Sequence, residues 1–232
     1  MITRPILFLA SFCIVSIAEV LALWMNWSSV HEIAKPLIML TLIGYYLSVS
    51  EKRNNSFVRA MFFCWVGDVL LMFQAQQEGF FMGGLVAFLV GHILYILTYR
   101  QLRWSTPVRE LLPTQKVRLL FPVILAGTGL LTVLFPKLGP LTIPVVIYSI
   151  VLMLMVVSAV FRFGRTSAGS MWLVLAGAWL FMASDSILAF NKFHTAIEYS
   201  GPLIMTTYIL AQFLIVEGAR RHPAKAEPAT VS

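Results

Sequence analysis

The chain has 232 residues, of which 59% are hydrophobic and only 12% are charged. A soluble domain carries about 25% charged residues, so the composition excludes a soluble globular protein and a disordered chain. The formal net charge is +7. It does not indicate nucleic-acid binding, because the basic residues form no patch interleaved with aromatic residues and instead gather between apolar stretches.

Eight apolar stretches approach the length of about 20 residues that a membrane-spanning helix needs. They cover residues 5–24, 33–49, 57–73, 80–99, 119–135, 141–161, 171–190 and 199–216. We therefore expect an all-α membrane protein, with an eight-transmembrane-helix bundle over residues 1–218. The polar, Pro- and Ala-rich remainder, residues 219–232, is expected to be a disordered cytoplasmic tail.

The basic residues predict the topology of this bundle. With eight helices, both termini and every second loop face one side, and that side collects fourteen Lys and Arg residues. The opposite side keeps three, namely Lys35, Lys137 and Lys192. Basic loops stay in the cytoplasm, so both termini are expected there. We expect a multi-pass protein of a bacterial inner membrane, or of the endoplasmic reticulum if the source is eukaryotic.

A short internal repeat connects the third and seventh stretches. Residues 67–73 (GDVLLMF) and 184–190 (SDSILAF) share the pattern small-Asp-x-aliphatic-Leu-x-Phe. The two copies lie four predicted helices apart along the chain, so the pattern is compatible with two parallel four-helix repeats, as in some transporter folds.

Three acidic residues, Glu19, Asp68 and Asp185, lie well inside predicted helices and, by helical rise, in the outer half of the membrane. An ionisable residue there costs at least about 2.5–3.5 kcal/mol and is a functional candidate by default. The alternative to a functional role is a structural hydrogen bond to a neighbouring helix. This alternative explains Glu19 better than the two aspartates, because the aspartates share one sequence pattern at a similar depth. If the aspartates face each other, repulsion in an apolar site keeps one protonated and one ionised, ready for acid and base catalysis.

Other polar residues are placed to line the same cavity. His92 and Tyr95 lie on one helix, Tyr208 and Gln212 share a face of the last helix, and Lys35 and Asn191 lie near outer helix ends. Each also has a structural explanation, such as an interhelical hydrogen bond or a helix cap. Pro36 is expected in the first turn of the second helix, where proline is common, with Lys35 either snorkelling to the interface or binding a phosphate.

Several other chemistries are excluded. The four histidines are too scattered for a zinc site, and no Gly-x-Ser-x-Gly nucleophile elbow occurs. Intramembrane aspartyl proteases use Gly-x-Gly-Asp, but here Trp65 stands where the first glycine belongs.

The chain resembles the YhhN-like lysoplasmalogenase family of integral membrane vinyl-ether hydrolases. The motifs behind this resemblance are Lys35-Pro36-Leu37, Gly67-Asp68 with residues 69–72, Phe88-x-x-Gly91-His92-x-x-Tyr95, Ser184-Asp185-Ser186-x-Leu188-Ala189 and Tyr208-x-x-x-Gln212. The resemblance implies hydrolysis of lysoplasmenyl-ethanolamine or -choline to a fatty aldehyde and glycerophospho-ethanolamine or -choline. Asp68 and Asp185 would be the catalytic pair, and Glu19 matches only by position.

The chemistry of a vinyl ether suits these residues. Protonation of its β-carbon gives an oxocarbenium ion, as in glycoside hydrolysis, so the site needs one protonated acid, one carboxylate and an apolar sleeve, with no metal or organic cofactor. We expect a lysophospholipid substrate drawn from the membrane lipids, bound by Lys35, Glu19, His92, Tyr95, Asn191, Tyr208 and Gln212. Asp68 is favoured as the acid, because its neighbours are more apolar than the serines beside Asp185.

Two other functions use the same residues. A proton-coupled transporter of small molecules or lipids would use the acids as carriers, although few Gly or Pro residues interrupt the predicted spans. In an inert assembly protein, replacing the aspartates would impair only association or expression.

Overall fold

The computed structural model describes residues 3–50 and 53–223. Within them lie eight helices that are long and apolar enough to cross a membrane, which confirms the predicted all-α membrane bundle. They are α1 (Arg4–Met25), α2 (Ser28–Val49), α3 (Asn55–Met72), α4 (Glu78–Gln101), α5 (Pro113–Leu134), α6 (Thr142–Val160), α7 (Ala168–Phe193) and α8 (Ser200–Arg220). Residues 224–232, most of the predicted tail, lie outside the described residues.

Local sequence signals explain where several helices begin and end. The Asn54 side chain accepts a hydrogen bond from the Phe57 backbone N–H at the start of α3, and Ser167 caps α7 in the same way through the Ser170 N–H. Both side chains satisfy a backbone donor that the helix itself leaves unpaired. At the end of α1 the chain turns through Asn26, which has a left-handed backbone conformation.

The second helix corrects one prediction. It begins at Ser28, five residues before the expected apolar stretch, so Pro36 lies inside the helix and not in its first turn. The predicted stretch omitted the first turns of the helix because they contain the polar residues His31 and Glu32. This correction matters for function, because it places His31 and Lys35 one helical turn apart on the same helix face.

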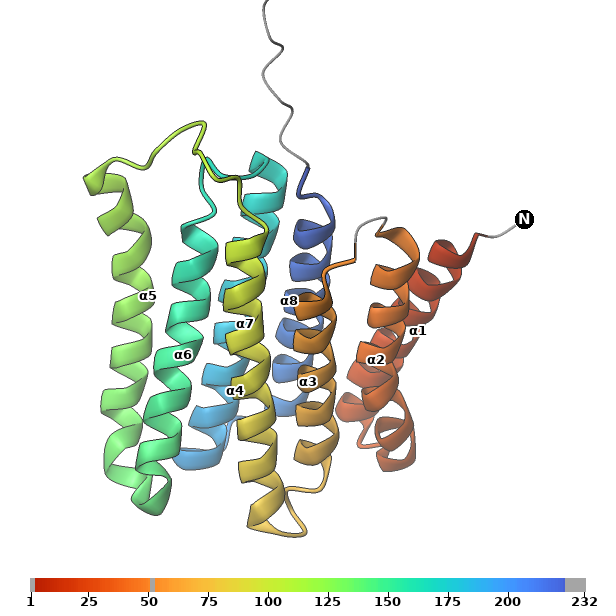
Figure 1. Ribbon diagram of the computed structural model, residues 1–232. Helices are drawn as coiled ribbons and strands as arrows, with labels where there is room; N and C mark the ends of the chain where they lie inside the picture. The colour runs from red at the N-terminus through yellow and green to blue at the C-terminus, as the bar shows by residue number, and fades with distance from the viewer. Residues whose placement is uncertain (1–2, 51–52, 224–232) are drawn as a thin grey trace, which may run out of the picture.

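The helices form an elongated bundle in which several helices that follow each other in the chain are also neighbours in space (Figure 1). Helix α5 lies at one edge against α6, while α1 and α2 pair at the opposite edge. Helices α3 and α4 pair with each other, as do α7 and α8. The start of α1 and the end of α8 lie at the same end of the bundle, as an even number of spans requires.

The outer surface of the bundle is apolar and the interior holds the polar groups. Ile14 and Ile143 are 68% and 73% exposed, which suits contact with lipid chains. Glu19, His92 and Gln212 are fully buried. Polar residues of membrane helices face the bundle interior in this way because hydrocarbon cannot hydrogen-bond to them.

Close packing of α7 on α8 depends on Gly177 and Gly218. A Cβ atom at Gly177 would lie 2.8 Å from the Ala211 carbonyl oxygen, and one at Gly218 would lie 2.8 Å from the Val174 backbone nitrogen. Small residues allow such backbone approach in membrane helices. The two helices that carry Asp185 and Tyr208 are thereby held rigidly together.

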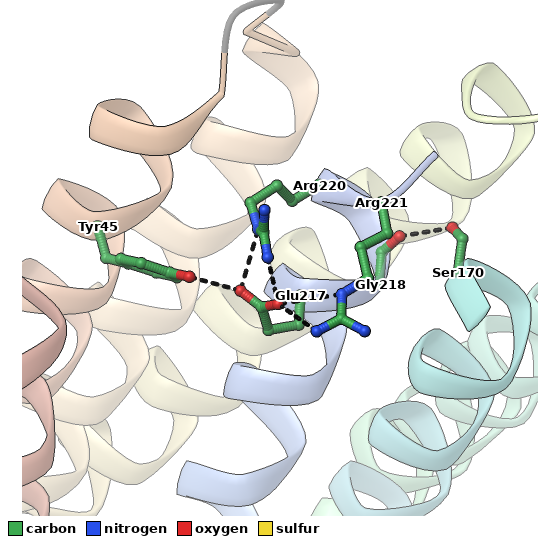
Figure 2. A network of polar contacts seen from close by, with 6 residues as sticks. All are labelled: Tyr45, Ser170, Glu217, Gly218, Arg220 and Arg221. Carbon is green, nitrogen blue, oxygen red and sulfur yellow. Dashed lines mark hydrogen bonds and ion pairs between the residues drawn. The ribbon is translucent and has the colours of Figure 1, made fainter. Parts of the chain in front are cut away.

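A polar network closes the end of the bundle where α8 ends (Figure 2). The Glu217 carboxylate accepts a 2.6 Å hydrogen bond from the Tyr45 hydroxyl of α2 and forms ion pairs with Arg220 and Arg221 at 2.7 and 3.0 Å. Nearby, the Ser170 hydroxyl of α7 donates to the Gly218 carbonyl at 2.5 Å. The network ties α2, α7 and α8 together, away from the cavities described below.

Candidate active site

Asp68 lies on α3 and is buried against α8. Its Oδ2 accepts a 2.6 Å hydrogen bond from the Tyr208 hydroxyl. The preceding residue, Gly67, permits this arrangement: a Cβ atom there would lie 2.5 Å from the Phe88 ring of α4. Phe88 therefore packs directly over the helical turn that carries the acid.

Asp185 lies on α7 and has an equivalent partner on α6. The Tyr148 hydroxyl donates a hydrogen bond of 2.5 Å to Asp185 Oδ2. The serines on either side are engaged elsewhere, because Ser184 donates to the Ile204 carbonyl and Ser186 to the Met182 carbonyl. Neither serine hydroxyl donates to the Asp185 carboxylate, so the polar surroundings expected for Asp185 come from Tyr148.

The two aspartates line one cavity. The cavity has a volume of about 300 Å³ and lies between α2, α3, α7 and α8. Its polar or charged lining residues are His31, Lys35, Asp68, Gln74, Ser184, Asp185, Asn191, Ser200 and Tyr208. We call this space the polar cavity.

A second, apolar cavity adjoins it between α4, α5, α6 and α7. Its lining is almost entirely aliphatic and aromatic, including Phe81, Leu130 and Phe193. Leu71, Phe88, Asp185 and Leu188 belong to the walls of both cavities. We call this second cavity the apolar groove. Asp185 therefore lies where the polar cavity meets the apolar groove.

His92 lies beside Asp185, outside the linings of both cavities. Its Nε2 is 4.0 Å from Asp185 Oδ2, and its ring packs edge-on against Phe181 and Tyr148. Neither ring nitrogen has a hydrogen-bond partner among the described residues. The structure thus brings His92 to the catalytic candidates by contact with Asp185.

Tyr95 and Gln212 form a separate buried pair. The Tyr95 hydroxyl donates a 2.6 Å hydrogen bond to Gln212 Oε1, and neither residue lines the polar cavity or the apolar groove. Gln212 shares a face of α8 with Tyr208, as predicted, but only Tyr208 reaches the polar cavity.

Two of the predicted binding residues, Lys35 and Asn191, lie in the wall of the polar cavity. Lys35 comes from α2 and Asn191 from the last turn of α7. The Asn191 side chain also accepts a 2.8 Å hydrogen bond from the Ile197 N–H, which shapes the α7–α8 connection. Asn191 thus combines the structural and the cavity-lining role that the sequence left open.

Glu19 is fully buried, and its partner was missed by the sequence analysis. Its Oε1 lies 2.8 Å from His31 Nδ1, and His31 lines the polar cavity while Glu19 does not. The signal for His31 is its spacing of four residues from Lys35, which becomes visible only once both residues are known to be helical. Among the described residues, no three His, Cys, Asp or Glu side chains gather as metal ligands would.

Comparison with known proteins identifies the family. The model of the YhhN family matches residues 30–219. The chain belongs to the YhhN family. The matched range contains α3–α7, nearly all of α2 and α8, and both aspartates, while Glu19 lies before it. This YhhN chain is matched by no solved structure.

Several curated relatives of this YhhN protein are named enzymes. The human lysoplasmalogenase TMEM86B is 30% identical over 86% of this chain and 78% of its own length. The bovine lysoplasmalogenase TMEM86A is 33% identical over 84% of this chain and 79% of its own length. A lysoplasmalogenase of Mycobacterium bovis is 32% identical over 72% of this chain and 61% of its own length.

Proposed function

We propose that this chain is a lysoplasmalogenase, an ether hydrolase that cleaves the vinyl ether bond of a lysoplasmalogen. The observation that carries the proposal is the position of Asp185, which lines the polar cavity together with Asp68 and also borders the apolar groove. In a lysoplasmalogen the vinyl ether joins the glycerol unit to the fatty chain. A substrate with its glycerol in one chamber and its chain in the other has the reactive bond beside Asp185.

Asp68 and Asp185 divide the reaction between them. The acid transfers its proton to the β-carbon, and the π electrons of the vinyl group form the new C–H bond, which leaves an oxocarbenium ion. The carboxylate stabilises this cation and takes a proton from the water that adds to it. The hemiacetal then collapses: its hydroxyl proton passes back to the first aspartate, the C–O bond to glycerol breaks, and the glycerol oxygen takes the proton that the second aspartate gained from water. The aldehyde is released and both aspartates regain their starting states.

Asp68 is the better candidate for the acid. Asp68 is buried, whereas Asp185 is only partly buried. A carboxyl group in a drier site favours its neutral form. Tyr208 and Tyr148 each bind one oxygen of an aspartate and leave the other oxygen for substrate and water.

The two cavities bind different parts of the lipid according to their polarity. The apolar groove accepts the alkenyl chain between α4, α5, α6 and α7, and the polar cavity accepts the glycerol and its phosphate near Lys35. A substrate with a single chain reaches both chambers from the membrane interface at the cavity end of the bundle. Phe88, in the wall of both chambers, packs along the bound chain at their junction.

The distribution of basic residues supports a proposed orientation in the membrane. The start of α1 and the end of α8 lie at one end of the bundle (Figure 1), and the sequence puts fourteen of the basic residues in the segments expected on that side. By the positive-inside rule this end is cytoplasmic. In a bacterium the polar cavity then opens toward the outer face of the inner membrane.

Aldehyde release in heavy water tests the function. The purified protein is given a lysoplasmenyl-ethanolamine in detergent, without any gradient, in ²H₂O. Protonation at the β-carbon places one deuterium on the carbon next to the aldehyde, and the same aldehyde added ready-made provides the exchange control. Deuterated aldehyde supports the hydrolase. Intact substrate, recovered unchanged or moved across the bilayer of proteoliposomes, contradicts it and supports the transporter alternative.

A further inference from the structure

Glu19 is a buried acid with a single partner. The residue is 0% exposed, its Oε1 lies 2.8 Å from His31 Nδ1, and its Oε2 has no hydrogen-bond partner among the described residues. A buried carboxylate is costly unless a cation or several donors compensate it. The 2.8 Å contact with His31 is the compensation that the structure offers.

His31 links this buried acid to the polar cavity. Its side chain is 25% exposed and belongs to the cavity lining. Because Glu19 engages Nδ1, the ring nitrogen left for a ligand is Nε2. A protonated imidazole held in this way presents an N–H donor with positive charge, which suits an anionic oxygen.

Lys35 supplies a second cation on the same helix face. It follows His31 by four residues on α2, and both residues line the polar cavity. Within residues 3–50 and 53–223, Lys35 forms no salt bridge. Its ammonium donors therefore remain available to a ligand.

The helical turn that carries these cations is fixed relative to Asp68. The Trp65 indole N–H of α3 donates a 3.1 Å hydrogen bond to the Pro36 carbonyl of α2. Trp65 lies one turn before Asp68 on the same helix. The distance between the cationic turn and the acid is therefore set by a direct link between α2 and α3.

We propose that His31 and Lys35 form a phosphate-binding subsite for the phosphodiester of a lysophospholipid, with Glu19 as the positioning residue that orients and charges His31. The inference rests on the proposed function for the identity of the lipid. It assigns Glu19 a role behind the cavity wall in place of direct contact with substrate. It also predicts that the subsite distinguishes a lysophospholipid from a neutral glycerol ether with the same chain.

Binding of two uncleavable lipids tests the subsite separately from catalysis. The probes are 1-O-hexadecyl-glycerophosphoethanolamine and 1-O-hexadecylglycerol, whose saturated ethers lack the vinyl group. Their dissociation constants are measured by calorimetry in detergent. The wild-type protein is expected to prefer the phospholipid, and His31→Gln and Lys35→Gln are each expected to reduce this preference about tenfold, the effect of losing one charge-assisted hydrogen bond.

Matched variants distinguish the loss of charge at the subsite from general damage to the fold. His194→Gln and Lys137→Gln replace the same residue types at the same end of the bundle, outside the polar cavity, and should keep the preference. His31→Arg should restore it, because it retains a cation. Glu19→Gln should reduce it while Glu32→Gln, at an exposed position on α2, should not.

The outcomes distinguish this proposal from the proposed function. Equal weakening of both lipids by His31→Gln and Lys35→Gln would overturn the subsite, as would a wild-type protein without any preference for the phospholipid. If glycerophosphoethanolamine competes with the bound lipid and inorganic phosphate at the same concentration does not, the result supports binding of a lipid phosphodiester. If only inorganic phosphate competes, the result overturns the proposed ligand. If the variants lose the preference but the wild type releases no aldehyde from a lysoplasmalogen, the subsite stands and the hydrolase proposal fails.

Discussion

Tyr208 reaches from α8 to Asp68 on α3 with a hydrogen bond of 2.6 Å between the hydroxyl and Oδ2. Tyr148 repeats this relationship from α6 to Asp185 on α7 at 2.5 Å. Each acid of the polar cavity thus has one oxygen held by a tyrosine from a different helix. The tyrosines fix the direction in which the second oxygen of each carboxyl group points.

Tyr208→Phe and Tyr148→Phe should each lower kcat about 10- to 100-fold, the effect of losing one hydrogen bond to a charged group. KM should change little, because the ring remains in place. Tyr199→Phe is the control, since Tyr199 is 52% exposed and lies outside the polar cavity. An unchanged kcat in both tyrosine variants would show that the hydrogen bonds are structural only.

Ala189→Phe should shorten the range of alkenyl chains that the protein accepts. Ala189 lines the apolar groove, so a phenyl group there occupies space that the chain needs. We expect turnover of a C18 substrate to fall more than that of a C10 substrate in a competition assay. Ala176→Phe is the matched control on α7, because Ala176 is exposed. The same loss for both chain lengths would contradict the assignment of the groove.

Glu217→Gln should destabilise the bundle without changing the chemistry. The variant loses the ion pairs with Arg220 and Arg221 and weakens the bond from Tyr45 (Figure 2). The expected cost is about 1–3 kcal/mol, measured by thermal unfolding in detergent, with kcat unchanged at low temperature. Glu110→Gln, at an exposed position, is the control. Equal stability of the two variants would refute a role for the network in folding.

The contact between His222 and the α6–α7 connection should weaken in acid. His222 Nδ1 lies 2.7 Å from the Thr166 hydroxyl. Burial, with a smaller contribution from the Arg162 guanidinium, lowers the pKa of His222 from 6.5 to about 4. Between these values a detached His222 binds a proton while the packed one does not, so stability falls as pH drops from 6.5 toward 4. The melting temperature of the wild type should therefore fall more than that of His222→Gln over this range, and parallel curves would exclude this role.

The sequence predicted the number of helices and the main acids, because both depend on local composition. Apolar runs mark the spans, and an aspartate inside such a run stands out by its cost. The start of α2 was missed because polar residues fill its first turns. The same error placed Pro36 at a helix start and hid His31, whose partner Glu19 lies on another helix.

Contacts between helices could not be predicted from one chain. Tyr148 gave no signal in the sequence, although it binds Asp185 from 37 residues away. Tyr95, Gln212 and Tyr208 were all expected at the cavity, but only Tyr208 reaches it. Helical periodicity shows on which face of its helix a residue lies. The residues that it contacts on other helices depend on how the helices pack.

The central claim, that Asp68 and Asp185 act together as acid and base, is tested most directly by single-turnover aldehyde release from lysoplasmenyl-ethanolamine. Asp68→Asn and Asp185→Asn should each reduce the rate by a factor of at least about 10²–10⁴. Both should keep a cooperative melting transition in detergent, and Glu198→Gln, an exposed acid at the same end of the bundle, should keep the wild-type rate. A rate near that of the wild type in either folded aspartate variant would contradict the account.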